Sequence, residues 1–127
     1  MTFSLLQGLR VVELGESVSA PYCTKLLADM GAEVVKIERP GVGDQSREYG
    51  PFLNDRPHHE RSGLFLYLNS NKQGITLNLD TPTGREILGA LLAKSQVFVH
   101  NLHPTEMDRL EVDYETLRAH NDQLVMA

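Results

Sequence analysis

The sequence predicts an α/β fold in which an open parallel sheet is flanked by helices. Short runs of apolar and β-branched residues, typical of buried strands, alternate along the chain with amphipathic segments of helical period. The segment between the first two runs is long enough for a helical crossover, which a parallel pair of strands requires. With 127 residues, of which 41% are hydrophobic, the chain has the size of one domain with its own core.

A strand, a helix and a second strand open the chain. The β-branched run at residues 10–14 stops at Gly15 and predicts the first strand. Ser19 is the expected N-cap of the helix that follows, and Gly31 supplies its C-terminal stop. Residues 33–38 predict the second strand. Together these elements predict a βαβ unit with a parallel pair of strands.

Strands and helices continue to alternate in the second half of the chain. The helix after Thr81 is the clearest, because Thr81 suits an N-cap and Pro82 suits the first helical turn. The expected elements are, in order, a helix at 62–69, a strand at 74–79, a helix from 81 to about 94, a strand at 96–100, short helices at 104–110 and 113–120, and a strand at 123–127.

The chain stops inside its last expected strand, and a domain seldom ends in an apolar strand. Either that strand is an edge of the sheet, or the chain is the N-terminal part of a larger protein. The pattern favours the larger protein. We therefore expect an open, Rossmann-like parallel sheet that is truncated in this chain.

Composition excludes several classes of function. A formal net charge of −5 argues against non-specific nucleic-acid binding, since no Lys/Arg cluster stands out. The single cysteine excludes an internal disulfide, and no long apolar run indicates a membrane span, so a cytoplasmic setting is expected. The histidines at 58–59 and at 100 and 103 lack a carboxylate or cysteine at ligand spacing, so we predict no metal site.

Loops at the carboxyl ends of the strands predict the position of a ligand site. These loops follow Leu14, Glu38, Leu79 and His100. In dinucleotide-binding folds, an acid that ends the second strand binds a ribose, and a nearby arginine accommodates a ribose phosphate. Glu38 and Arg39 offer both groups, although the first turn lacks the second and third glycines of that fingerprint. The alternative is a solvated Glu38–Arg39 pair of little energetic value.

Four ordered blocks cover essentially the whole chain, namely "LQGLRVVELGESVSAPYCTKLLADMGAEVVKIERPGVGDQSR", "YLNSNKQGITLNLDTPTGRE", "VHNLHPTEMDRL" and "DYETLRAHNDQLV". These blocks resemble the N-terminal portion of class III coenzyme A transferases. This family includes formyl-CoA and carnitine CoA-transferases and the related α-methylacyl-CoA racemases. The long segment at 39–61 resembles the transferase branch more than the racemase branch.

The resemblance implies that residues 1–127 form a CoA-binding, nucleotide-side α/β domain. Arg39 then lies by the adenosine end of CoA, Leu77 matches an apolar contact for the adenine, and Arg109 matches a basic residue near the phosphates. Two departures stand out, because Val18 replaces a glutamine of formyl-CoA transferases and Ala20 replaces a usual glycine. The CoA-binding residues implied in this way are Ser17, Val18, Ser19, Arg39, Leu77, Asn101, Leu102 and Arg109.

The family's reaction moves CoA between two carboxylic acids through an aspartate that becomes an enzyme-bound anhydride. By resemblance, that aspartate lies past Ala127, so no catalytic residue is assigned in this chain, which we expect to be inactive alone. No cofactor is expected to bind tightly, because CoA and acyl-CoA are substrates, and a carboxylic acid is the acceptor. A homodimer is expected for the full-length enzyme. The alternatives are the racemase branch and a non-catalytic CoA- or nucleotide-binding remnant.

Overall fold

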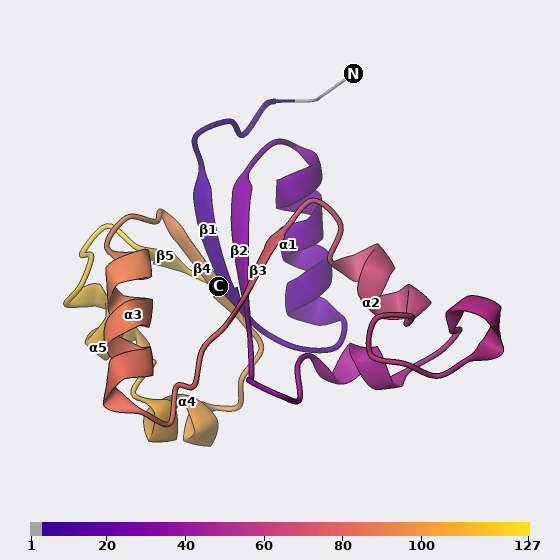
Figure 1. Ribbon diagram of the computed structural model, residues 1–127. Helices are drawn as coiled ribbons and strands as arrows, with labels where there is room; N and C mark the ends of the chain where they lie inside the picture. Colours follow the sequence, from indigo (N-terminus) through magenta and orange to yellow (C-terminus); the bar gives the residue numbers. More distant parts are fainter. Residues whose placement is uncertain (1–3) are drawn as a thin grey trace.

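Within residues 4–127, which the computed structural model describes, five parallel strands form one sheet in the order β3-β2-β1-β4-β5 (Figure 1). The strands are β1 (Arg10–Leu14), β2 (Glu33–Glu38), β3 (Gln73–Thr76), β4 (Val97–His100) and β5 (Val125–Met126). The helices are α1 (Ser19–Asp29), α2 (Gly63–Leu68), α3 (Pro82–Leu92), α4 (Pro104–Leu110) and α5 (Tyr114–Arg118). The predicted open α/β sheet is therefore confirmed.

The centre of the sheet is β1, which pairs with β2 on one side and β4 on the other. Successive side chains of a strand point to opposite faces. Val11 accordingly packs with Ala28 of α1, whereas Val12 packs with Leu92 of α3 and Phe98 of β4. The adjacent residues Val11 and Val12 are therefore both buried, because elements pack on both faces of the sheet.

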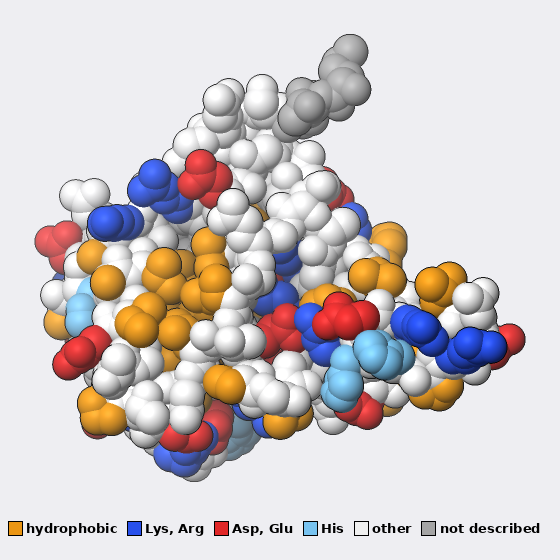
Figure 2. All heavy atoms as spheres, viewed as in Figure 1, with side chains coloured by type: hydrophobic (Ala, Val, Ile, Leu, Met, Phe, Trp, Pro, Cys, Tyr) orange, Lys and Arg blue, Asp and Glu red, His pale blue; other side chains and the backbone are white. Residues whose placement is uncertain are grey.

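The sheet face beneath α3 is not fully covered. An apolar groove of about 330 Å³ lies between this helix and the central strands, lined in part by Val35, Ile87 and Leu91. Figure 2 shows hydrophobic side chains gathered at this place. No helix within residues 4–127 is long and apolar enough to cross a membrane.

Several boundaries differ from the expected ones for identifiable reasons. Val18, not Ser19, is the N-cap of α1, because the Ser19 hydroxyl binds the Asn101 side chain instead of the helix backbone. The third strand ends at Thr76, since the chain turns at Asn78, whose carbonyl accepts bonds from the Thr81 backbone N–H and hydroxyl. The remaining expected elements are present with boundaries that differ by a few residues.

Three helices start at a capping side chain, and the predicted N-cap Thr81 is confirmed. The side chains of Ser62, Thr81 and Asp113 each accept a hydrogen bond from a backbone N–H three residues later, which is the geometry of an N-cap. The last strand, β5, lies at one edge of the sheet.

The long loop after β2 is an ordered structure that contains two 3₁₀ turns, η1 (Gln45–Glu48) and η2 (Leu53–Asp55). Arg47 holds it in place with two bonds to Glu38, at 2.8 and 2.9 Å, while its guanidinium carbon lies 3.6 Å from the centre of the Phe65 ring. The buried Ser62 hydroxyl donates to carbonyls of the same loop. The loop therefore packs against α2 and fixes the chain that follows β2.

Gly84→Ala is expected to lower the free energy of unfolding by about 1–3 kcal/mol, as overpacking does. Helix propensity alone predicts the opposite sign by about 1 kcal/mol. In α3, however, a Cβ at Gly84 would overlap the carbonyl oxygen of Asn78. Urea denaturation with Gly74→Ala as control, where a Cβ meets nothing within 4 Å, tests this expectation. A Gly84→Ala variant as stable as wild type would show that this packing constraint is absent.

Candidate functional site

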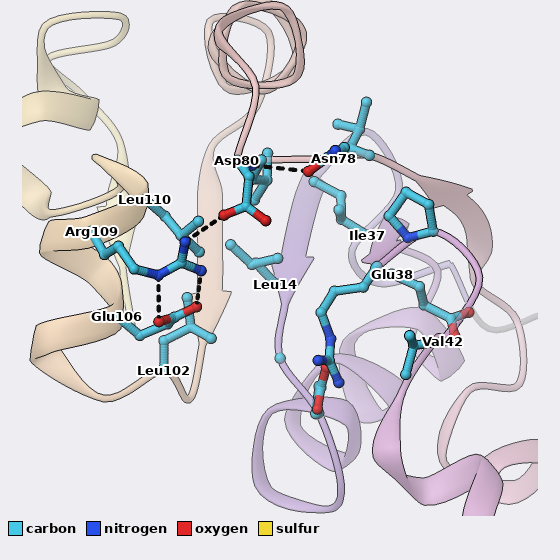
Figure 3. Close-up of a pocket in the computed structure, with 16 residues that line it drawn as sticks. Leu14, Ile37, Glu38, Val42, Asn78, Asp80, Leu102, Glu106, Arg109 and Leu110 are labelled. Atoms are coloured by element: carbon cyan, nitrogen blue, oxygen red, sulfur yellow. Dashed lines mark hydrogen bonds and ion pairs between the residues drawn. The ribbon is translucent and has the colours of Figure 1, made fainter.

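A cleft of about 500 Å³ lies at the carboxyl ends of β1 and β2, bounded by the β3–α3 loop and by α4 (Figure 3). Its floor is apolar, because Leu14, Ile37 and Leu79 are buried beneath it. From β1 the sheet grows through β2 and β3 on one side and through β4 and β5 on the other, so the strand order reverses beside the cleft. Open α/β sheets bind ligands at such a reversal. The volume lies in the range of small-molecule sites.

On α4, Arg109 is held by two carboxylates at one wall of the cleft (Figure 3). Its Nε and Nη2 donate to Glu106 at 2.9 and 2.6 Å, and its Nη1 donates to Asp80. These bonds raise the pKa of the Arg109 guanidinium, and the bond from Arg109 lowers the pKa of the Glu106 carboxyl. All three side chains are at least 41% exposed.

On the β2 side of the cleft, Arg39 binds Glu16, with 2.8 Å between Nε and Oε1. The sequence-based alternative of a Glu38–Arg39 pair is wrong, because Glu38 binds Arg47 instead. Neighbouring residues at a strand end project to opposite sides, which separates the two side chains. Burial raises the pKa of the Glu38 carboxyl, but the bonds from Arg47 and from the Asp44 backbone N–H outweigh it, so this pKa lies below its ordinary value.

The first turn, Gly15–Ser19, is held by side chains from two other loops. The Asn101 carboxamide accepts from the Glu16 N–H at 3.0 Å and donates to the Glu16 carbonyl at 2.7 Å and to the Ser19 hydroxyl at 3.0 Å. Asp44 accepts from the Ser17 N–H at 3.0 Å. These bonds hold Ser17 at a positive φ of 64°, which is uncommon for a residue other than glycine.

Within this turn, Gly15 makes room for Ala20. A Cβ at Gly15 would overlap the Ala20 methyl group, which is buried against it. Ala20 therefore occupies the space that opens where Gly15 lacks a side chain. The first turn and α1 consequently meet more closely than two larger residues would allow.

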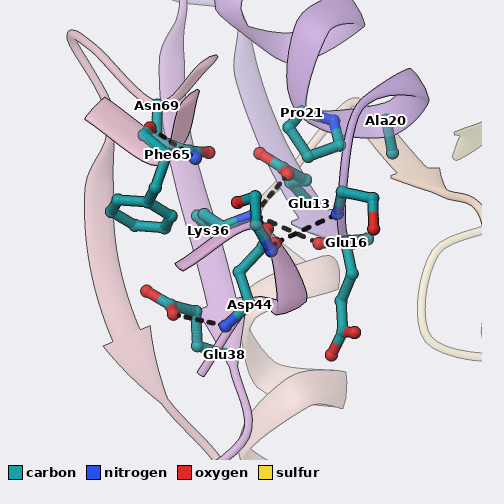
Figure 4. A network of polar contacts seen from close by, with 12 residues as sticks. Glu13, Glu16, Ala20, Pro21, Lys36, Glu38, Asp44, Phe65 and Asn69 are labelled. Carbon is teal, nitrogen blue, oxygen red and sulfur yellow. Dashed lines mark hydrogen bonds and ion pairs between the residues drawn. The ribbon is translucent and has the colours of Figure 1, made fainter. Parts of the chain in front are cut away.

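A network of buried charges lies directly behind the first turn (Figure 4). Lys36 of β2 binds Glu13 of β1 at 2.8 Å and Asp44 of the following loop at 2.7 Å, and it also donates to the Gly15 carbonyl at 3.1 Å. Lys72 binds the second oxygen of Glu13 at 2.8 Å, and the Thr24 hydroxyl donates to the same oxygen at 2.6 Å. The four charged side chains are at most 2% exposed, and their formal charges balance.

The network shifts the proton affinities of its members. Burial raises the pKa of the Asp44 carboxyl, but Lys36 and the N–H groups of Ser46 and Ser17 outweigh it, so this pKa lies below its ordinary 3.8. Burial lowers the pKa of the Lys72 ammonium despite the charge of Glu13. A lowered carboxyl pKa stabilises the fold above the unfolded value, so the Asp44 contribution is present at neutral pH and is lost as the pH falls through the lowered pKa.

The sequence-predicted residues divide into two groups. Arg39, Leu77, Leu102 and Arg109 line the cleft. Ser17, Val18, Ser19 and Asn101 instead form the first turn or bind it, next to the Glu16 that lines the cleft. Their contact with a ligand stays a prediction. Among residues 4–127, no group of three or more histidine, cysteine or acidic side chains is arranged to hold a metal ion.

The charged partners of the two arginines were missed by sequence reasoning. Glu106 and Arg109 are three residues apart on one helix, and this spacing is a signal that could have paired them. Asp80 and Glu16 carry no such signal, because each meets its arginine from a distant part of the chain. Lys36 and Asp44 behind the first turn also carry no such signal, because their pairing depends on how the loop after β2 folds back.

Lys36→Met is expected to lower the free energy of unfolding by about 3–5 kcal/mol, because it leaves two buried carboxylates without their shared partner. Arg10→Met is the matched control, since it breaks an ion pair with Glu33 whose side chains are 54% and 65% exposed, and it should cost less than about 1 kcal/mol. Denaturation curves of both variants at neutral pH make the comparison. Equal, small losses would contradict the central role of Lys36.

Comparisons with known proteins agree with one another. The model of CoA-transferase family III matches residues 6–127. A succinyl-CoA:mesaconate CoA-transferase of Haloarcula marismortui is 43% identical over 120 residues, which are 94% of this chain and 30% of the relative. A formyl-CoA:oxalate CoA-transferase of a Bradyrhizobium species is 41% identical over 122 residues, 96% of this chain and 28% of the relative.

Solved structures show the same relationship. A CAIB/BAIF family protein from Brucella suis superimposes with a TM-score of 0.85 at 34% identity, over 97% of this chain and 32% of that protein. The chain thus spans about 30% of the length of the curated relatives that it matches. Because the family model covers nearly the whole chain, the protein belongs to CoA-transferase family III.

Proposed function

We propose that this chain carries the CoA-binding half of a CoA-transferase, an enzyme that moves CoA between carboxylic acids. The cleft is the observation that carries the proposal, because its apolar floor lies between two arginines, Arg39 after β2 and Arg109 on α4. CoA has the complementary chemistry, with a flat adenine ring beside a ribose phosphate and a pyrophosphate. Guanidinium groups bind such phosphates through paired, charge-assisted hydrogen bonds.

In this proposal, the adenine packs against Leu77 and Leu102, which are both half-buried and line the cleft. Arg39 contacts the ribose phosphate. The first turn then lies toward the thioester end, as the resemblance of Ser17, Val18 and Ser19 implies. Val18 is 52% exposed and offers the acyl group an apolar surface where, by the resemblance, formyl-CoA transferases carry a glutamine.

The chemistry that we propose passes through an aspartyl anhydride. A carboxylate nucleophile attacks the thioester carbonyl and the CoA thiolate leaves, which forms the anhydride. The thiolate then attacks the aspartyl carbonyl of the anhydride and the donor acid leaves as its carboxylate. The acceptor carboxylate next displaces the thiolate from the aspartyl carbonyl, and the thiolate attacks the acceptor's carbonyl in the new anhydride, so that the acceptor leaves as its CoA thioester and the aspartate is restored. No aspartate of this chain matches the family's nucleophile. We therefore propose that residues 1–127 bind CoA without exchanging it, which an assay with an acyl-CoA and a carboxylate acceptor would test.

Two further points concern the whole enzyme. The curated relatives are named for transfer of CoA between acids, and this supports the transferase branch over the racemase branch. A homodimer of the full-length enzyme and a cytoplasmic location stay predictions.

Arg39→Ala is expected to weaken CoA binding by about 1–3 kcal/mol, as the loss of a charge-assisted contact does. Wild type and variant are each titrated calorimetrically with CoA and with dephospho-CoA, which lacks the ribose phosphate. The four affinities form a thermodynamic cycle that isolates the interaction between Arg39 and this phosphate. If Arg39 binds that phosphate, wild type already binds dephospho-CoA poorly, and the substitution adds little for this ligand.

The matched control is Arg10→Ala, which removes another exposed arginine paired with a glutamate, at the opposite end of β1. It should leave both affinities unchanged. If Arg39→Ala loses the same affinity for CoA and for dephospho-CoA, Arg39 contacts the pyrophosphate and not the ribose phosphate. An Arg39→Ala variant that binds both ligands like wild type would remove Arg39 from the CoA site.

A further inference from the structure

Both arginines of the cleft are occupied by carboxylates of the protein itself. Arg109 engages three of its five N–H donors, two with Glu106 and one with Asp80 (Figure 3). Arg39 engages its Nε with Glu16. A phosphate that enters the cleft therefore meets guanidinium groups whose donors are already partly used.

The charges of the cleft do not favour a polyanion in this arrangement. Glu38 is compensated by Arg47, which comes from outside the cleft lining. The remaining lining charges are three carboxylates, from Glu16, Asp80 and Glu106, against the two arginines. One negative charge is in excess, so phosphate binding has to overcome repulsion as well as compete for donors.

The contacts around Arg109 are of a kind that can be exchanged. The side chain of Arg109 is 55% exposed, and those of Asp80 and Glu106 are 62% and 41% exposed. Exposed ion pairs of this type contribute little to stability, so their rearrangement costs little. The buried network behind the first turn is different, because its charged side chains are at most 2% exposed.

We propose that Glu106 is an affinity-setting residue of the CoA site, which competes with the ligand's phosphates for Arg109 and is displaced when CoA binds. The proposal rests on the proposed function and names the residue that limits its strength. Asp80 holds the remaining engaged donor of Arg109 and returns the guanidinium to the same place after release. A role in which Glu106 merely orients Arg109 for the ligand predicts the opposite sign, because its loss would then weaken binding.

The test is the affinity of Glu106→Gln for CoA, measured by calorimetry on the full chain at low ionic strength. Glutamine keeps the size of the side chain and removes its charge, so CoA should bind about three- to tenfold more tightly. The gain should shrink in high salt, which screens exposed charges. Pantetheine, which carries no phosphate, should bind wild type and variant equally.

Two further variants isolate the interaction. Glu115→Gln is the matched control, because Glu115 pairs with Arg118 three residues later on α5, outside the cleft lining, and it should leave CoA affinity unchanged. In an Arg109→Gln background, Glu106→Gln should give a clearly smaller gain, since the contested guanidinium is gone. Circular dichroism melts establish that each variant is folded.

The possible outcomes separate the two proposals. If wild type binds CoA and Glu106→Gln binds it equally or more weakly, the competition is refuted while the proposed function stands. The competition is likewise refuted if the gain persists in full without Arg109. If folded wild type shows no CoA binding at all, the proposed function is overturned, and the role of Glu106 with it.

Discussion

The shared ion pair of Lys36 with Glu13 and Asp44 is the interaction on which the rest of the site depends. It joins β1, β2 and the loop after β2 in the interior of the protein, where an unpaired charge would be strongly destabilising. The same groups reach the first turn, because Lys36 donates to the Gly15 carbonyl and Asp44 accepts from Ser17. The buried charges that join the two strands therefore also fix the conformation of the first turn.

The cleft combines this rigid support with exchangeable charges at its surface. Its floor consists of buried leucine and isoleucine side chains that belong to the sheet core. Its arginines, in contrast, are exposed and paired with carboxylates that are exposed or half-buried. Shape and apolar contact are thus fixed before a ligand arrives, while the phosphate-binding groups have alternative partners. In the proposed CoA site, this division lets the protein hold the ligand and also release it.

Local patterns predicted much of the fold, and long-range pairings escaped them. The apolar residues of β1 and β2 and the cap Thr81 depend on neighbouring residues, so the sequence alone sufficed to predict them. The Glu38–Arg39 pair failed because adjacency along an extended chain separates side chains in space. Four of the eight predicted binding residues line the cleft. Arg39 was indicated by its position after the second strand, whereas Leu77, Leu102 and Arg109 were located only by the resemblance to a known family.

The central claim, that CoA occupies the cleft at the carboxyl ends of β1 and β2, is tested most directly by amide chemical-shift changes in ¹⁵N-labelled protein during titration with CoA. The account predicts that saturable changes concentrate at Gly15, Arg39, Leu77, Leu102 and Arg109, which line the cleft or follow its lining strands directly. Amides of the outer face of α1 farther from the first turn, such as that of Leu26, should not respond. Saturable changes confined to that outer face, or none at any ligand concentration, would contradict the account.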